Sequence, residues 1–112
     1  AIRKLLKEGD MKKAAQFLGY DFYIDGSVVE GEKRGRQIGY PTANLDTDWE
    51  ILPKEGVYAT RSRIDGKKFD SITNIGYRPT FGENRLLIET HIFDFSGDIY
   101  KKRLAVEFVE RI

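Results

Sequence analysis

Hydrophobic and polar positions along the chain follow two different periods. From position 2 to 18, apolar residues recur at the spacing of a helix, with Ile2 and Leu5 on one stripe and a second stripe after Asp10. From Tyr20 onward the spacing is that of strands, in which alternate residues face the same way. The pattern therefore predicts a short helical segment followed by a β domain.

Residues with capping chemistry divide the helical segment in two. Gly9 can adopt the left-handed conformation that ends a helix, and Asp10 is a good N-cap for the next one. Gly19 is placed to end that second helix. We expect residues 1–19 to form an arm or linker that packs on a neighbour.

Strand patterns separated by turn signals fill the rest of the chain. Asp65–Gly66, between "VYATRSRI" and "KFDSITNI", predicts a hairpin, and "RLLIETHIFDF" predicts a long strand. In "RLAVEFVERI", Leu104, Val106 and Phe108 alternate on one face. No helical pattern separates these segments, so at least five mostly hairpin-joined strands are expected, in an antiparallel barrel or sandwich.

Composition excludes several classes of function. The 112 residues suit one domain, and the 19 basic and 18 acidic side chains nearly cancel, which argues against a nucleic-acid partner. The absence of cysteine excludes disulfides, thiolate metal sites and thiol catalysis. No apolar run has the length of a membrane span, so no membrane partner is expected.

The glycine-rich segment "GEKRGRQIGYPTANL" (residues 31–45) carries groups that suit phosphate binding. Its glycines let the backbone approach an anion, and its arginines could donate charge-assisted hydrogen bonds. Thr42 and Asn44 offer hard oxygen donors of the kind that Mg²⁺ accepts. No helix follows, so the segment is neither a P-loop nor a dinucleotide fingerprint, and an ordinary inter-strand loop is the alternative.

Glu89 is a charged residue that the strand pattern does not explain. In "LLIETHIFDF", alternation places it with Leu87 and His91 on a largely apolar face, where unpaired burial of a carboxylate would be costly. Glu89 should therefore reach a partner, a metal or a solvent-filled pocket. It could serve as a general base, or form a cross-strand salt bridge with an arginine. His91, the single histidine, is assigned a packed structural role.

A third segment, "NIGYRPTFGEN" (residues 74–84), is expected to form a long mobile loop between two strands, because it contains two glycines and a proline. Its Tyr77 and Phe81 could stack on a planar ring, or could plug one end of the barrel.

Together these segments resemble the riboflavin kinase domain of bacterial bifunctional riboflavin kinase/FAD synthetases. The matching strings are "GSVVEG", "GRQIGYPTANL", "LPKEGVYA", "NIGYRPTF", "ETHIFDFSGDIY" and "LAVEFVERI", in the family's order and spacing. The opening 26 residues resemble the segment that joins an adenylyltransferase domain to the kinase. The resemblance covers essentially the whole chain.

The resemblance implies a six-stranded antiparallel Greek-key barrel in a cytoplasmic enzyme. The implied reaction transfers the γ-phosphoryl of ATP to the ribityl 5′-hydroxyl of riboflavin, giving FMN and ADP, with Mg²⁺ as cofactor. Carried over position by position, it implies a catalytic base at Glu89, magnesium ligands at Thr42 and Asn44, ATP contacts at Gly31, Arg36, Gly39, Pro41, Thr42 and Asn44, and a flap over the flavin at Tyr77, Arg78 and Phe81.

The resemblance also implies how the chain is divided. Residues 1–19 would be a helical linker from a covalently attached adenylyltransferase domain, and residues 20–112 the barrel, truncated before a C-terminal helix that helps to form the flavin site. Tyr40 replaces the usual phenylalanine, and Lys101 stands where a glycine is usual. The alternative function is a β-barrel nucleotide- or flavin-binding or interaction module that keeps the scaffold without catalysis.

Overall fold

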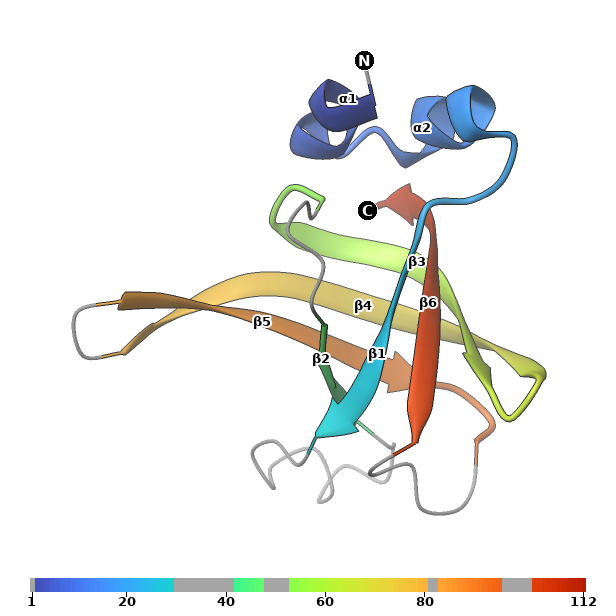
Figure 1. Cartoon of the computed structure of the whole chain (residues 1–112), viewed down its shortest axis with the longest axis vertical. Helices are drawn as coiled ribbons and strands as arrows, with labels where there is room; N and C mark the ends of the chain where they lie inside the picture. The colour runs from blue at the N-terminus through green and yellow to red at the C-terminus, as the bar shows by residue number, and fades with distance from the viewer. Residues whose placement is uncertain (1, 30–41, 48–52, 81–82, 96–101) are drawn as a thin grey trace.

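The structure, a computed structural model, describes residues 2–29, 42–47, 53–80, 83–95 and 102–112. Within them, two short helices precede six strands (Figure 1). The elements are α1 (Ile2–Glu8), α2 (Met11–Leu18), β1 (Tyr23–Val29), β2 (Thr42–Asp46), β3 (Gly56–Ile64), β4 (Lys67–Thr80), β5 (Glu83–Ile92) and β6 (Arg103–Arg111).

The six strands close into an antiparallel barrel in the order β1-β2-β5-β4-β3-β6. Strands β3, β4 and β5 follow one another as neighbours, and β6 then returns to lie beside β3. The resulting order β6-β3-β4-β5 is that of a Greek key. The predicted fold class is therefore confirmed, and so is the Asp65–Gly66 hairpin, whose two turn residues have φ of 52° and 77°.

Inside the barrel, aliphatic and aromatic side chains share the space with a row of hydroxyls. Tyr58 and Phe108 are fully buried and meet edge to face, with ring centroids 5.1 Å apart. The expected alternation of Leu104, Val106 and Phe108 is confirmed, because all three side chains are buried. The buried hydroxyls form a hydrogen-bonded chain that runs from β3 through β4 to β5, in the order Ser62, Ser71, Thr60, Thr73 and Thr90.

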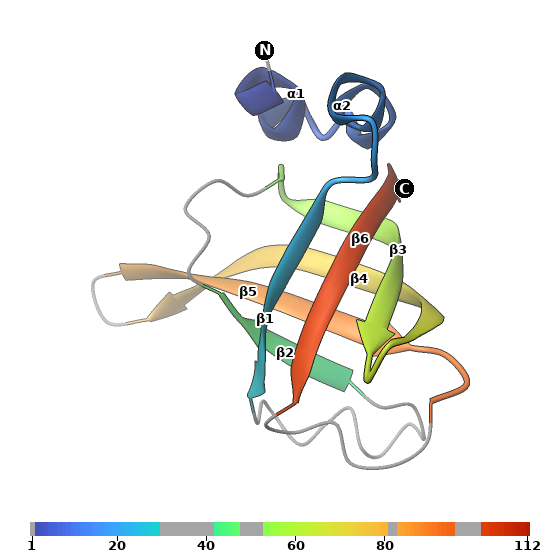
Figure 2. The same ribbon diagram turned by 45° about the vertical axis from the view of Figure 1, so that its right-hand side comes forward.

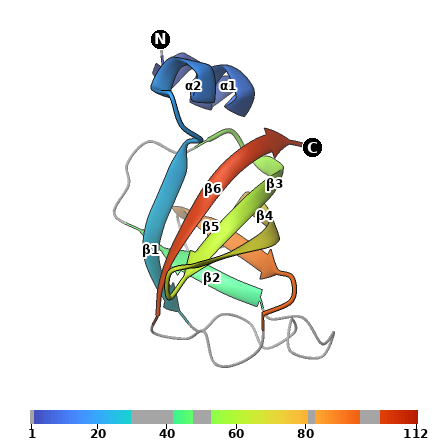
Figure 3. The ribbon, with the colours of Figure 1, turned by 90° about the vertical axis from the view of Figure 1, so that its right-hand side faces the viewer.

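The two helices cover one end of the barrel (Figures 2 and 3). The predicted caps are confirmed: the Asp10 side chain accepts a hydrogen bond from the Lys13 backbone N–H at 3.1 Å, and Gly19 ends α2 in the left-handed conformation. Leu6 and Met11 are buried in the same hydrophobic cluster as the barrel interior. The helical segment thus packs on the barrel itself.

Two expectations about β4 and β5 need correction. The segment expected as a loop after Asn74 is strand, because β4 runs to Thr80 and pairs with β5 as far as Thr80 opposite Glu83. Strand β5 ends at Ile92, since Asp94 has a φ of 59° that breaks the strand expected to reach Phe95. Beyond the closed barrel, β4 and β5 continue as a projecting two-stranded ribbon (Figure 1).

Candidate active site on the outer face of the barrel

Three polar residues lie side by side across neighbouring strands. Glu89 in β5 is directly opposite Asn44 of β2 on one side and Asn74 of β4 on the other. Directly opposed residues in antiparallel strands have Cα atoms about 4.5–5.5 Å apart, so side chains on one face can touch the same small molecule. We refer to these three residues as the Asn–Glu–Asn row.

The row faces outward because its strand neighbours face inward. Ile88 and Thr90 on either side of Glu89 are buried, and so are Ala43 and Leu45 on either side of Asn44. Glu89 and Asn44 are half-buried, whereas Asn74 is exposed. The alternation predicted for β5 is therefore observed, and it carries the charge of Glu89 out of the core.

The outward position removes the burial problem that Glu89 posed in the sequence. Within the described residues, Glu89 makes no hydrogen bond or ion pair, so the salt bridge to an arginine is not seen in that part of the chain. A half-exposed carboxylate without a fixed partner can accept a proton from a bound molecule. The geometry at Glu89 suits a general base.

Thr42 lies two residues from Asn44 along β2. It is the register partner of His91, two residues from the Asn44–Glu89 pair, which corresponds to about 7 Å along a strand. His91 is half-buried and has interactions of its own. The four other residues expected to contact ATP, which are Gly31, Arg36, Gly39 and Pro41, lie outside the described residues.

A close contact between β1 and β2 fixes the strand that carries Asn44. A Cβ atom on Gly26 would lie 2.1 Å from the backbone oxygen of Asp46, so only glycine allows β1 to approach β2 this closely. Next to it, the Thr47 hydroxyl donates a hydrogen bond of 2.9 Å to the Asp25 backbone oxygen. The glycine of "GSVVEG" therefore helps to position the "PTAN" strand.

The residues expected to form a flap lie on the ribbon or beyond the described part of the chain. The Tyr77 side chain is 55% exposed, and strand alternation places it on the ribbon face opposite to that of Asn74 and Glu89. The backbone of Arg78 pairs with Arg85. Phe81 lies outside the described residues. The structure thus does not bring Tyr77 onto the face of the Asn–Glu–Asn row.

Asn74 is the site residue that the sequence reasoning missed. The glycines and the proline that follow it predict a loop that begins at Asn74, but Ser71, Thr73 and Ile75 alternate around it and all three are buried. Following that alternation past Asn74 would have extended the strand and placed its amide outward.

Three further features of the described ranges concern metal sites, cavities and membrane spans. No three His, Cys, Asp or Glu side chains gather there as they would around a metal ion. A cavity of about 390 Å³ lies away from the row, at residues of β3, of β4 and just after β5: Arg61, Lys68, Phe69, Asp70, Phe93 and Asp94. No helix in the described part of the chain is long and apolar enough to span a membrane.

Known proteins resemble this chain over almost its whole length. It is 41% identical over 115 residues to the bifunctional riboflavin kinase/FMN adenylyltransferase of Bacillus subtilis, and 42% identical over 113 residues to that of Haemophilus influenzae. These alignments cover 99% and 100% of this chain but only 36% and 37% of the relatives. The chain thus spans about a third of the length of these relatives.

The fold is matched equally well. A crystal structure described as a macrolide-efflux protein from Streptococcus pneumoniae superposes with a TM-score of 0.92 at 38% identity, covering 99% of this chain and 37% of the other. The family called Flavokinase, described as riboflavin kinase, matches residues 18–112. With the six-stranded barrel, the "PTAN" strand and Glu89 beside it, the chain belongs to the riboflavin kinase family.

Proposed function

We propose that this chain transfers the γ-phosphoryl group of ATP to the 5′-hydroxyl of riboflavin, giving FMN and ADP. Membership of the riboflavin kinase family supports the reaction. The observation that carries the proposal is the register pairing of Glu89 with Asn44, which sets a carboxylate beside the amide of the "PTAN" strand on an outward face.

In this proposal Glu89 is the catalytic base. A lone pair of the riboflavin 5′-oxygen forms the new bond to the γ-phosphorus, while the bond from that phosphorus to the β,γ-bridging oxygen breaks and its electrons leave with ADP. The hydroxyl proton passes to the Glu89 carboxylate as the new bond forms. Phosphoryl transfer depends mainly on positioning and charge neutralisation, so a small set of polar residues can suffice.

The donor chemistry of Thr42 and Asn44 fits Mg²⁺. Both offer neutral oxygen atoms, and Asn44 is half-exposed beside Glu89. Magnesium takes few protein ligands because phosphates and water complete its coordination. When bound, the ion would neutralise charge on the ATP phosphates.

Further roles rest on the resemblance. Gly31, Arg36, Gly39 and Pro41 would contact ATP together with Thr42 and Asn44, and Tyr77, Arg78 and Phe81 would act as a flap over the flavin. The relatives are bifunctional, so an adenylyltransferase domain in the same chain is proposed as the covalent partner, and the cytoplasm as the compartment.

Chromatography of a mixture of riboflavin, MgATP and the protein tests the function directly. The wild type should form FMN, and Glu89→Gln should lower kcat by about 100-fold or more while leaving ATP binding intact. Glu55→Gln is the matched control, because the Glu55 side chain is exposed and lies at the barrel end that faces the helices. FMN formation by Glu89→Gln at the wild-type rate would refute the role of Glu89 as the catalytic base. Binding of riboflavin by the wild type without formation of FMN would favour a non-catalytic module.

A further inference from the structure

The buried hydroxyl chain inside the barrel ends next to the proposed base. It begins in β3 and reaches β5 only at Thr90, the residue that follows Glu89. The inward neighbours of Thr90 on β5, Ile88 and Ile92, are hydrocarbon side chains. Burying a hydroxyl costs more than burying a methyl group unless the hydroxyl is hydrogen-bonded, so the presence of Thr90 in this strand needs a reason.

The Thr90 hydroxyl joins β5 to β4. It lies 3.0 Å from the Thr73 hydroxyl, and the two threonines are directly opposed in the antiparallel pairing. Thr73 comes just before Asn74 and Thr90 just after Glu89, so this hydrogen bond lies beside the Asn74–Glu89 pair, on the inner side of the sheet. On the β2 side, the register partner of Thr90 is Ala43, whose methyl group makes no hydrogen bond.

The inward apolar pattern does not by itself fix how β4 and β5 are aligned. A slip of one residue would turn the buried side chains outward, but a slip of two residues would keep them inward. A two-residue slip would place Thr90 opposite Ile75 or Ser71 instead of Thr73. Opposite Ile75 its hydroxyl would have no partner, and opposite Ser71 it would meet a hydroxyl that already shares two hydrogen bonds. The observed alignment is the one that pairs the two threonine hydroxyls.

The turn between these strands is distant from Glu89. The pair nearest the turn is Thr80–Glu83, and Asn74 lies six residues further along β4 (from position 80 to 74), or about 20 Å. The pairing of β3 with β4 ends at Ile75, so this length is a ribbon without support from β3. A turn formed one residue earlier along the chain would shift every pair by two. A hydrogen bond inside the barrel therefore adds to the alignment at Glu89 independently of the turn.

We propose that Thr90 is a positioning residue, whose hydrogen bond with Thr73 holds β5 at the level where the Glu89 carboxylate meets the substrate hydroxyl. The inference rests on the proposed kinase function and adds the buried group that aligns the catalytic base. The Asp65–Gly66 turn aligns β4 with β3, and the close approach at Gly26 aligns β2 with β1. Strand β5 lies between β2 and β4, and the threonine pair aligns it with both.

Valine in place of threonine tests this role, because it removes the hydroxyl and keeps the branched shape. Thr90→Val should lower kcat for FMN formation by about tenfold or more, since a displacement of about 1 Å at a reacting group can cost about 100-fold. The KM values for riboflavin and ATP should change by less than about twofold, because the substrate contacts remain. Thr73→Val removes the same hydrogen bond from the other strand and should lower kcat to a similar extent. Thr90→Ser keeps the hydroxyl and should retain kcat within about twofold of the wild type.

Thr60→Val is the matched control within the same hydroxyl chain. It removes the hydrogen bonds to Ser71 and Thr73 and leaves the bond between Thr73 and Thr90 in place. Its stability should fall at least as much as that of Thr90→Val, since two hydrogen bonds are lost instead of one, but its kcat should stay near the wild-type value. Urea denaturation measures stability. Calorimetric titration with MgATP counts the binding-competent sites, so that unfolded protein is not mistaken for a loss of kcat.

The outcomes distinguish this inference from the function on which it rests. If the wild type forms FMN and Thr90→Val keeps the wild-type kcat, the positioning role is wrong and the kinase function stands. Equal losses of kcat in Thr60→Val and Thr90→Val, or a serine variant as slow as the valine variant, would also overturn the role. If Thr90→Val does not fold, the double variant Thr73→Val/Thr90→Val replaces it, because every remaining hydroxyl of the chain keeps a partner there. If the wild type forms no FMN, the kinase function and the positioning role are both wrong.

Discussion

At the scale of single residues, Gly26 and Gly76 are opposite cases of the same residue type. A Cβ atom at Gly26 would lie 2.1 Å from a backbone oxygen, whereas one at Gly76 would meet open space. Both lie in strand interiors, so sequence alone does not tell them apart. The first glycine is required by packing between strands, and the second leaves room on an outward face.

This contrast predicts opposite effects on stability. Gly26→Ala should lower the free energy of unfolding by about 2–3 kcal/mol, because the Asp46 backbone cannot yield as a flexible side chain would. It should also weaken ATP binding, since β2 carries Thr42 and Asn44. Gly76→Ala, the matched control, should leave stability unchanged or raised. Urea denaturation measures both, and an unchanged midpoint for Gly26→Ala would contradict the close approach.

At the scale of elements, the sequence pattern predicts the helix ends and turns that depend on one or two neighbouring residues. The caps at Asp10 and Gly19 and the turn at Asp65–Gly66 each depend on one or two residues, and all were found. The pattern is wrong along β4, where Gly76 and Pro79 predict a loop and the structure has a strand. In a two-stranded ribbon, half of the backbone N–H groups point away from the partner strand, so a proline that lacks one is tolerated.

The candidate site shows the same boundary between local and non-local information. The residues of "PTAN" and Glu89 could be named from the resemblance, but not the fact that Asn44 and Asn74 flank the carboxylate. That arrangement depends on the register of three strands from distant parts of the chain. The hydrophobic pattern of each strand shows which residues face the core, and a tight turn fixes the register of a hairpin. Neither shows that β2 and β5, which no hairpin joins, are neighbours in the barrel.

The buried hydroxyl chain gives a prediction for the β3–β4–β5 sheet. The Thr73 hydroxyl shares hydrogen bonds with those of Thr60, at 2.9 Å, and Thr90, at 3.0 Å. Thr73→Val should cost about 1–3 kcal/mol of unfolding free energy, because the Thr90 hydroxyl loses its partner inside the barrel. Adding Thr90→Val should recover part of that loss in a double-mutant cycle. Strictly additive losses would show that the two hydroxyls do not interact.

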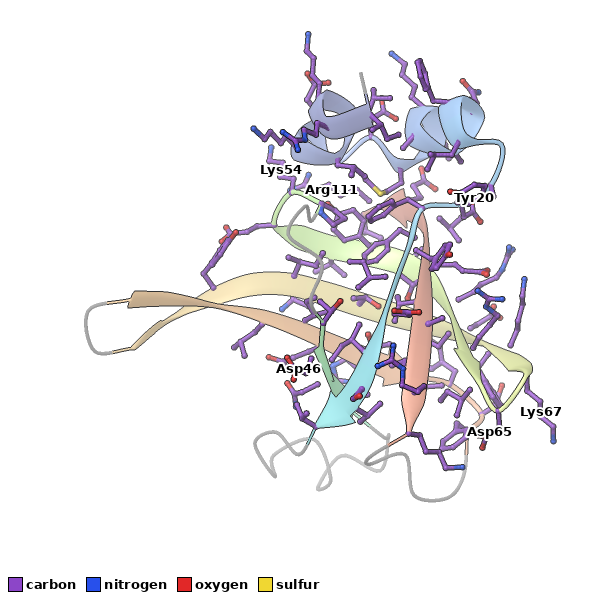
Figure 4. All side chains as sticks on the ribbon, in the orientation of Figure 1. Tyr20, Asp46, Lys54, Asp65, Lys67 and Arg111 are labelled. Carbon is purple, nitrogen blue, oxygen red and sulfur yellow. The ribbon has the colours of Figure 1, made fainter. Side chains whose placement is uncertain are left out.

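At the scale of the whole molecule, a polar cluster joins the helices to the end of the barrel. The Tyr58 hydroxyl donates a hydrogen bond to the Lys54 backbone oxygen, and the Arg111 guanidinium donates one of 2.9 Å to the Glu55 backbone oxygen. Figure 4 shows Lys54 and Arg111 near each other, at the end of the barrel that faces the helices. The Lys54 backbone N–H donates to the Leu6 backbone oxygen at 2.8 Å. The cluster therefore links the end of β6, the start of β3 and α1.

Tyr58 makes the stability of this polar cluster sensitive to alkaline pH. Burial raises the pKa of the Tyr58 hydroxyl above its ordinary value of 10.0, although the nearby Arg111 charge opposes the shift. The folded protein therefore holds this proton above pH 10, where the unfolded chain releases it. The corresponding stability is fully present below pH 10 and is lost as the pH rises through the folded-state pKa.

The expected result is a decline in the free energy of unfolding above pH 10 that is shallower in Tyr58→Phe than in the wild type. Phenylalanine also removes the hydrogen bond to Lys54, so the slope with pH is compared rather than the absolute stability. Urea denaturation at several pH values between 8 and 11 measures it. Equal slopes for the two proteins would exclude Tyr58 as the source.

Substitutions in the helical segment test whether residues 1–19 are part of the folded barrel domain. If residues 1–19 were only a linker, changes within them would leave the barrel's stability unchanged. Met11, however, is 1% exposed and lies in one hydrophobic cluster with Phe22 and Phe108 of the barrel. Met11→Ala should therefore lower the free energy of unfolding by about 3 kcal/mol. Phe17→Ala on the same helix is the control, because Phe17 is 69% exposed and its removal should cost less than about 0.5 kcal/mol. Equal, small effects of both variants would make the segment a linker, whereas a large effect of Met11→Ala alone makes α1 and α2 part of the kinase fold.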